Sequence, residues 1–144
     1  MSLGKAVKQK RMKNKLIKKD VTQLIRRAKK VARDDGSEIS GLLIHNGHFI
    51  EVLETNNVRE EGGHFCFDEK QIKVIKRAAK ELGHEIVGTF HSHPAYFAEP
   101  GEADIEEAVD DSLMLIIDCM DSKARLWRIK DGRAKEAIME MIEV

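Results

Sequence analysis

Two histidines, His91 and His93, follow an apolar run, and their type and spacing could bind a metal ion. The run before them, 86–90, predicts a β-strand, and alternate residues of a strand point to the same side of a sheet. We therefore expect both imidazoles to point one way and Ser92, a potential supporting residue, to point the other way. Pro94 has no backbone N–H to give to a strand ladder, so the strand should end there.

Asp104 is the third candidate ligand. It lies in the first turn of a helical run, 103–110, where a carboxylate is well placed to project outward. Two imidazoles and one carboxylate form the ligand set of a catalytic zinc site, in which the fourth position is left for water. This interpretation requires Asp104 to fold back over the end of the histidine strand. The alternative is structural, because a His-x-His pair by itself is common at surfaces and turns.

Glu38 is the candidate for the base that such a site needs. Zinc lowers the pKa of a bound water to about 7, and a neighbouring carboxylate can take its proton as the water attacks a carbonyl. Glu38 begins a predicted strand, 38–45, that could lie beside the histidine strand. The alternative is an ordinary exposed glutamate at the end of a strand, and the residues alone favour that alternative.

The elements that must position these residues are predicted from periodicity and turn signals. Helices are expected where apolar residues recur at helical spacing after a capping Asp, and strands where apolar runs end in turns such as the two-residue turn Asn46-Gly47. The expected helices are 20–33, 68–82 and 103–110. The expected strands are 38–45, 48–53, 64–67, the histidine strand, 113–119, 124–130 and 135–144, the last of which could also be a helix. This order predicts a mixed sheet with two packed helices.

Length and composition limit the class of protein. The 144 residues suffice for one domain with a sizeable core, and 35% charged with 42% hydrophobic residues is typical of a soluble globular chain. We expect no membrane segment and a cytoplasmic location, because no apolar run approaches about 18 residues and no signal peptide is visible. Cys66 and Cys119 have neither the number nor the spacing of a zinc site or a disulfide framework, so we expect them to be buried apolar residues.

The net charge of zero hides a strong asymmetry. Residues 1–33 carry 13 Lys and Arg but one acid, Asp20, which gives +12, and residues 34–144 carry −12. We expect residues 1–19 to be a flexible basic arm and residues 20–144 to be the folded domain. The arm could be a solvated tail, or it could bind nucleic acid or an acidic partner. It has no aromatic residues, which weakens the case for single strands bound by base stacking.

Taken together, these motifs resemble those of the JAMM metallopeptidases, also called the MPN-plus family. The family pattern is a glutamate just before a Gly-Leu-Leu strand, then His-x-His-Pro, six residues, Ser, two residues and Asp. Residues 38–43 fit the first part, residues 91–94 fit the second, and Asp104 stands at the required distance. Residues 87–90 are also similar, and the resemblance runs from about residue 20 to the C-terminus.

The resemblance implies a fold and an activity. The implied fold is α/β (α+β), with a mixed, mostly antiparallel curved sheet flanked by two main helices in the cytidine-deaminase-like JAMM/MPN architecture. His91, His93 and Asp104 would hold Zn²⁺, and Glu38 would be the general base. The implied reaction is hydrolysis of amide bonds at the C-terminus of ubiquitin-like proteins or, in prokaryotic relatives, of sulfur-carrier proteins.

One position departs from the family pattern. The residue that should be serine is Gly101. That serine is taken to stabilise the oxyanion, and losing one oxyanion donor costs roughly a hundredfold or more in turnover. A second interpretation is therefore an MPN-type module that binds metal and a partner but has weak or no activity. A third is a DNA-repair-associated relative of the RadC type, which shares the His-x-His-Pro signature and has only the basic arm in its favour.

Overall fold

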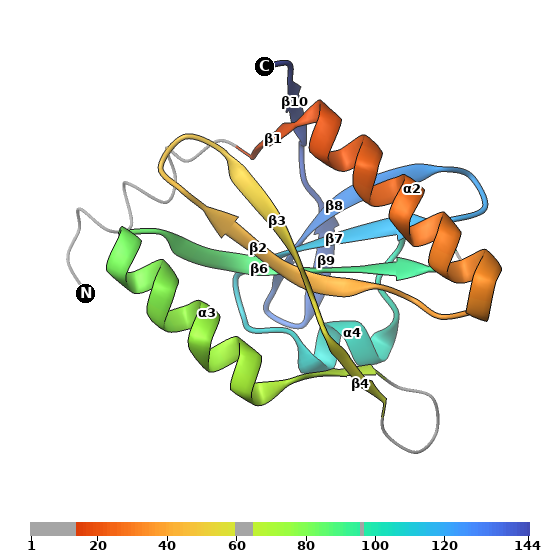
Figure 1. The fold of residues 1–144 in the computed structure, drawn as a ribbon, viewed down its shortest axis with the longest axis horizontal. Coiled ribbons are helices and arrows are strands. Elements are labelled where there is room, and N and C mark those ends of the chain that lie inside the picture. Colours follow the sequence, from red (N-terminus) through yellow and green to blue (C-terminus); the bar gives the residue numbers. More distant parts are fainter. Residues whose placement is uncertain (1–13, 60–64, 96) are drawn as a thin grey trace.

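The fold is seen in a computed structural model that describes residues 14–59, 65–95 and 97–144 (Figure 1). Within these residues the helices are α2 (Lys18–Asp35), α3 (Glu69–Leu82) and α4 (Glu102–Glu107). The strands are β1 (Lys15–Ile17), β2 (Ser40–His45), β3 (Ile50–Thr55), β4 (Asn57–Arg59), β5 (Phe65–Phe67), β6 (Glu85–His93), β7 (Ser112–Asp118), β8 (Lys123–Lys130), β9 (Arg133–Glu136) and β10 (Glu140–Ile142).

Eight of these strands form one mixed sheet, and β4 and β5 pair separately. The order across the sheet is β10-β1-β3-β2-β6-β7-β8-β9. The pairs β2–β3, β2–β6, β7–β8 and β8–β9 are antiparallel, whereas β1–β10, β1–β3 and β6–β7 are parallel. The predicted mixed, mostly antiparallel sheet is confirmed, and it curls with α2 and α3 packed along it (Figure 1).

Helix α2 begins earlier than the sequence suggests. Its N-cap residue is Ile17, which makes no side-chain capping bond, and Asp20 lies in the first turn, where its charge favours the helix dipole. Ahead of the helix, Leu16 of β1 is only 1% exposed. Residues 14–19 are therefore part of the folded domain rather than of the predicted arm, and the remainder of that arm, residues 1–13, lies outside the described residues.

Local sequence signals explain α3 fully and the first hairpin in part. The side chain of Asp68 accepts backbone hydrogen bonds at the start of α3, including one from Gln71, as predicted. The β2–β3 hairpin is also confirmed, but its loop spans residues 46–49 rather than the two predicted. The reason is that the Asn46 side chain accepts the N–H of Phe49 at 3.0 Å, which stabilises a wider turn.

The two faces of the sheet bury different side chains. Phe90 of β6 and Leu115 of β7 are fully buried in a cluster that includes Leu24 of α2. The next residue of β7, Ile116, points the other way and belongs to a second cluster, against which Ile105 of α4 packs. Burying each such side chain contributes about 1.5–3 kcal/mol, which enforces the alternation. Helices α2 and α4 therefore cover opposite faces of the sheet.

The C-terminal residues complete both edges of the sheet. β9 pairs with β8 at one edge, and β10 pairs in parallel with β1 at the other. The preference for strand over helix in 135–144 is thus confirmed, but the segment contributes to two short strands at opposite edges rather than forming one. None of the helices in the described part of the chain combines the length and apolar character needed to cross a bilayer.

Candidate metal centre

His91 and His93 lie at the C-terminal end of β6, on the α4 side of the sheet. The strand is held between β2 and β7, where Ser40 pairs with His91 from one side and Ile116 from the other. The side chains of His91 and His93 are 3% and 13% exposed. Their Nε2 atoms are 2.9 Å apart, so the prediction that both imidazoles point the same way is confirmed.

Asp104 completes the cluster from α4. The N–H of Gly101, just before the helix, donates to Asp104 Oδ2 at 2.8 Å and orients the carboxylate. The same Oδ2 lies 3.4 Å from His91 Nε2 and 3.9 Å from His93 Nε2. Asp104 thus folds back over the end of β6, as the metal-site interpretation requires. Among the described residues, these three form the one group of His, Cys, Asp and Glu whose candidate ligand atoms all lie within 4.8 Å of one another.

A backbone carbonyl fixes the ring state of His93. Its Nδ1–H donates to the carbonyl oxygen of Phe97 at 2.8 Å, which leaves Nε2 with its lone pair facing the cluster. Sequence reasoning missed this contact, because every residue has a carbonyl and the 75% exposed Phe97 side chain gives no signal of its role.

Burial and neighbouring charges set the protonation of the cluster. Burial lowers the pKa of His93 below 6.5, and the nearby His91 adds to this effect, whereas the Phe97 hydrogen bond opposes it. Burial alone would raise the pKa of Asp104, but the hydrogen bond and charge of His91 and the N–H of Gly101 outweigh it, so this pKa falls below 3.8. A neutral imidazole and an ionised carboxylate, the forms that bind metal, are therefore favoured at neutral pH.

The donor set fits zinc. Ligand atoms around a tetrahedral zinc ion lie about 2.0–2.1 Å from the metal, and hence about 3.3 Å from one another. The three separations in this cluster, 2.9, 3.4 and 3.9 Å, bracket that value. Two nitrogen donors and one oxygen donor also leave a fourth position for water or substrate. The cluster can therefore hold the predicted Zn²⁺ with small side-chain adjustments.

Ser92 points to the opposite face from the histidines, as predicted, and ties β6 to the segment before β2. Its Oγ accepts the N–H of Ile39 at 2.8 Å, and its own N–H donates to the Ile39 carbonyl at 3.0 Å. The fully buried hydroxyl also hydrogen-bonds to the thiol of Cys119, whose pKa is raised by burial and by the charge of Asp118. Ser92 thus contacts the backbone beside the ligands rather than the ligand cluster itself.

Glu38 is half-buried and lies just ahead of β2. Because Ile39 is bonded in both directions to Ser92, the preceding residue, Glu38, falls opposite His93. Directly opposed residues of antiparallel strands point to the same face of a sheet. The backbone of Glu38 is therefore beside the ligand-bearing end of β6.

Comparison with known proteins identifies the family. The profile of the family described as prokaryotic homologs of the JAB domain matches residues 19–130, which include Glu38, both histidines and Asp104. The chain belongs to this family. It is a JAB/MPN domain of the JAMM-like type, as the resemblance implied. A search of curated protein sequences finds no match.

Solved structures share the fold of this JAB domain. A protein from Desulfitobacterium hafniense is 23% identical with a TM-score of 0.76, covering 92% of this chain and 94% of its own. A JAB1/MPN domain protein from Archaeoglobus fulgidus is 16% identical with a TM-score of 0.54, covering 92% and 100%. A structure described as a JAMM metalloprotease-like zinc site in the proteasome and signalosome is 18% identical with a TM-score of 0.52, covering 92% and 98%. These likenesses confirm the JAB/MPN fold.

In this JAB domain, Gly101 occupies a position that does not need glycine. Its φ of −80° and ψ of 170° are extended values that any residue adopts. A Cβ at Gly101 would meet only Asp104 Oδ2, at an ordinary 3.6 Å. The expected serine would therefore fit. The backbone N–H, which could have replaced the serine hydroxyl as an oxyanion donor, is already donated to Asp104.

Proposed function

We propose that this JAB domain is a zinc-dependent metallopeptidase that cleaves isopeptide or peptide bonds. The observation that carries the proposal is the convergence of His91 Nε2, His93 Nε2 and Asp104 Oδ2 from a strand and a separate helix. A histidine pair with a purely structural role needs no carboxylate folded over it. The protonation states favoured at neutral pH support the same conclusion, because they are those of metal ligands.

Each residue has a distinct task in the proposed reaction. His91, His93 and Asp104 hold the zinc ion, which when bound supplies a Lewis acid and lowers the pKa of a coordinated water to about 7. Glu38 acts as the general base: it accepts a proton from the attacking water and passes it to the amine that leaves. The placement of Glu38 opposite His93 supports this assignment.

The proposed substrates are ubiquitin-like or sulfur-carrier proteins joined through their C-terminus to another amine. Membership of the JAB family supports this choice, and so does the site chemistry, since an amide carbonyl is polarised by a metal ion and attacked by water in one step. The partner in this reaction is therefore a small protein whose C-terminal tail reaches the end of β6.

Gly101 favours a second candidate function. Without the serine hydroxyl, and with its own N–H given to Asp104, this position offers no free donor to a developing oxyanion. A domain that keeps its metal ligands but lacks this donor could act as a binding module that holds a ubiquitin-like partner and turns it over slowly or not at all.

Metal analysis combined with a cleavage assay tests the proposal. We expect one zinc per chain after purification from metal-replete cells, and cleavage of linear fusions to ubiquitin-like proteins of the same organism. Glu38→Gln should abolish cleavage and keep the zinc, whereas Glu51→Gln, at an exposed position of β3, should leave both unchanged. Full zinc with no cleavage of any fusion would support the binding module instead, and a chain that binds no zinc would overturn both functions.

A further inference from the structure

The solvent-facing side of α2 differs from that of α3. Every exposed residue of α2 before Asp34 is polar, and every charged one among them is a cation; they are Lys18, Lys19, Thr22, Gln23, Arg26, Arg27, Lys29, Lys30 and Arg33. The exposed side of α3 also carries cations, but it mixes them with the acids Glu69 and Glu81 and with the apolar Val74 and Leu82. Of these two helices, α2 is therefore the one that presents a uniform positive surface without apolar residues.

Four residues of α2 form one line along this surface, which we call the α2 stripe: Lys19, Gln23, Arg26 and Lys30. They follow one another at intervals of four, three and four, the spacing that places side chains on one face of a helix. Other cations of α2 are engaged, since Lys18 pairs with Glu143 at 3.4 Å and Arg27 with Glu54 at 3.2 Å. Within the described residues, the stripe cations make no ion pair.

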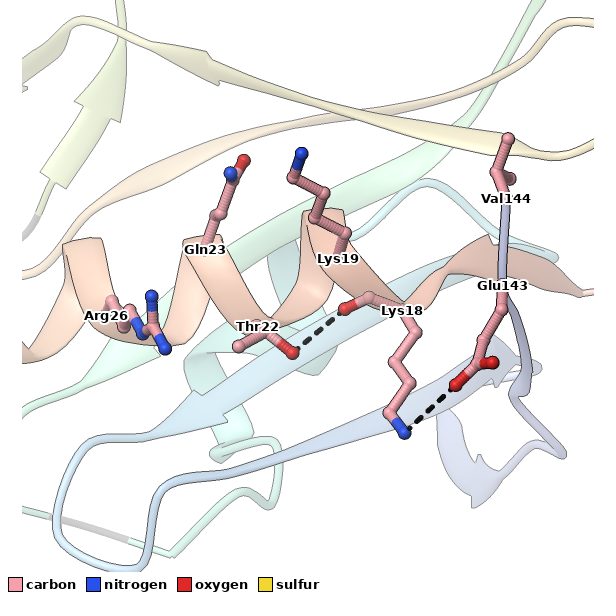
Figure 2. Close-up of a pocket in the computed structure, with 7 residues that line it drawn as sticks. All are labelled: Lys18, Lys19, Thr22, Gln23, Arg26, Glu143 and Val144. Carbon is pink, nitrogen blue, oxygen red and sulfur yellow. Dashed lines mark hydrogen bonds and ion pairs between the residues drawn. The ribbon is translucent and has the colours of Figure 1, made fainter.

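An open hollow of about 450 Å³ lies beside the N-terminal half of the α2 stripe (Figure 2). Figure 2 shows the side chains of Lys19 and Gln23 projecting from the same side of the helix, with the end of the chain at Glu143 and Val144 across from α2. Lys18, Lys19, Thr22, Gln23 and Arg26 supply the α2 wall of this hollow. The wall offers ammonium, guanidinium and amide donors, groups that proteins use to contact phosphate oxygens, whereas the Thr22 hydroxyl donates to the Lys18 carbonyl at 2.9 Å.

We infer that the α2 stripe is a binding surface for the phosphate backbone of duplex nucleic acid. An acidic protein partner fits less well, because protein interfaces are centred on apolar and aromatic anchors and the exposed side of α2 has none. Single-stranded nucleic acid also fits less well, since the helix offers no aromatic side chain on which bases could stack. The sequence ahead of the helix adds to the positive charge, with five Lys and Arg and no acid in residues 1–13.

The dimensions and the location of the stripe agree with this assignment. Lys19 and Lys30 are eleven residues apart, which corresponds to about 16 Å along a helix. A DNA duplex carries one negative charge per about 1.7 Å of its axis, so a phosphate lies within reach of each stripe cation. Because α2 and α4 cover opposite faces of the sheet, the surface is separate from the metal cluster, and the inference does not rest on the proposed peptidase function.

Fluorescence anisotropy with a labelled 20-base-pair duplex tests the inference. The full chain should bind the duplex with an affinity that falls steeply between 50 and 200 mM salt. In the triple variant Lys19→Gln, Arg26→Gln, Lys30→Gln, the slope of log affinity against log salt should fall by about three, because each lost phosphate contact removes about one. We expect at least a tenfold loss of affinity at 50 mM salt. Zinc content and thermal midpoint should not change, since all three side chains are exposed.

A matched control is available on α3. The triple variant Lys73→Gln, Lys76→Gln, Lys80→Gln removes the same charge from exposed positions and should leave most of the salt slope intact. An equal loss of affinity in the two triple variants would overturn the inference, since it would mean that only net charge matters. Two other results would also overturn it: tighter binding of a single strand of the same length, or equally tight binding of poly-glutamate at equal charge.

Discussion

The two sides of the domain, one at α4 and one at α2, present their polar groups in opposite ways. On the α4 face, polar groups are oriented by specific hydrogen bonds, as in the 2.8 Å contacts of His93 with Phe97 and of Asp104 with Gly101. On the outer side of α2, the helix that covers the other face, cations are exposed to solvent, and those of the α2 stripe make no ion pair among the described residues. Metal binding on the first side depends on the distances between a few atoms. Nucleic-acid binding on the second depends on the sum of many charges. Single substitutions should therefore be decisive on the α4 face and nearly additive on the outer side of α2.

The largest expected effect comes from removing the ionised ligand. Asp104→Asn should lower zinc affinity by more than about a hundredfold, because even groups that only support metal ligands contribute about 10–100-fold. Competitive titration against a zinc chelator measures the change. Glu106→Gln, at an exposed position of the same helix, is the matched control and should bind zinc as the unaltered chain does. Full zinc affinity in Asp104→Asn would contradict the expectation that a single substitution on the α4 face is decisive for metal binding.

The next effect tests the position where the family serine is missing. Gly101→Ser should raise the turnover of a ubiquitin-like fusion by up to about a hundredfold, the amount that one oxyanion donor contributes. Gly101→Ala is the control, because it adds the same Cβ, which has room at 3.6 Å from Asp104 Oδ2, without the hydroxyl. Equal turnover in the two variants would show that no hydroxyl is needed at this position.

A smaller effect is expected behind the ligands, at Ser92. Ser92→Ala leaves the buried N–H of Ile39 without its 2.8 Å acceptor, which should cost about 1–3 kcal/mol in the free energy of unfolding. If Ser92 also positions Glu38, kcat should fall while KM and zinc content stay the same. Ser92→Thr restores the hydroxyl and should recover kcat. A loss of stability with unchanged kcat would limit Ser92 to a structural role.

The smallest effect concerns pH. In the folded, metal-free chain the pKa values of His93 and Asp104 lie below their ordinary values of 6.5 and 3.8. The unfolded chain therefore binds more protons in acid, so stability should fall as the pH drops through 6.5 and again through 3.8. Urea midpoints of the metal-free protein at pH 7.5, 5.5, 4.5 and 3.0 measure both steps. His93→Gln should flatten the first step, and the exposed His48→Gln should not.

The ligand cluster could be predicted from the sequence because its geometry follows from short-range rules. Two residues of a strand at i and i+2 share a face whatever surrounds them, and the family spacing then placed Asp104. The parts that could not be predicted depend on backbone atoms or on distant pairing. The backbone groups of Phe97 and Ile39 that contact His93 and Ser92 leave no side-chain signature, and Glu38 could be placed only once β2 and β6 were seen to pair.

The edges of the domain were harder to predict for a similar reason. β1 is three residues long and lies in a run of lysines, so neither its composition nor its periodicity indicates a strand. It forms because Leu16 is buried and because β10, more than 120 residues later, pairs with it. The first hairpin loop was misjudged because the side chain of Asn46, rather than Gly47, determines the length of the turn.

The parallel pairing of β1 with β10 has a mechanical consequence. The start of β1 and the end of β10 lie at opposite ends of their ladder, so tension applied through the two chain termini would load all of its hydrogen bonds together in shear. An antiparallel pair pulled in the same way would open one bond at a time. A protease-coupled unfoldase or an optical trap that pulls on both termini should therefore meet its first resistance at this three-residue clamp.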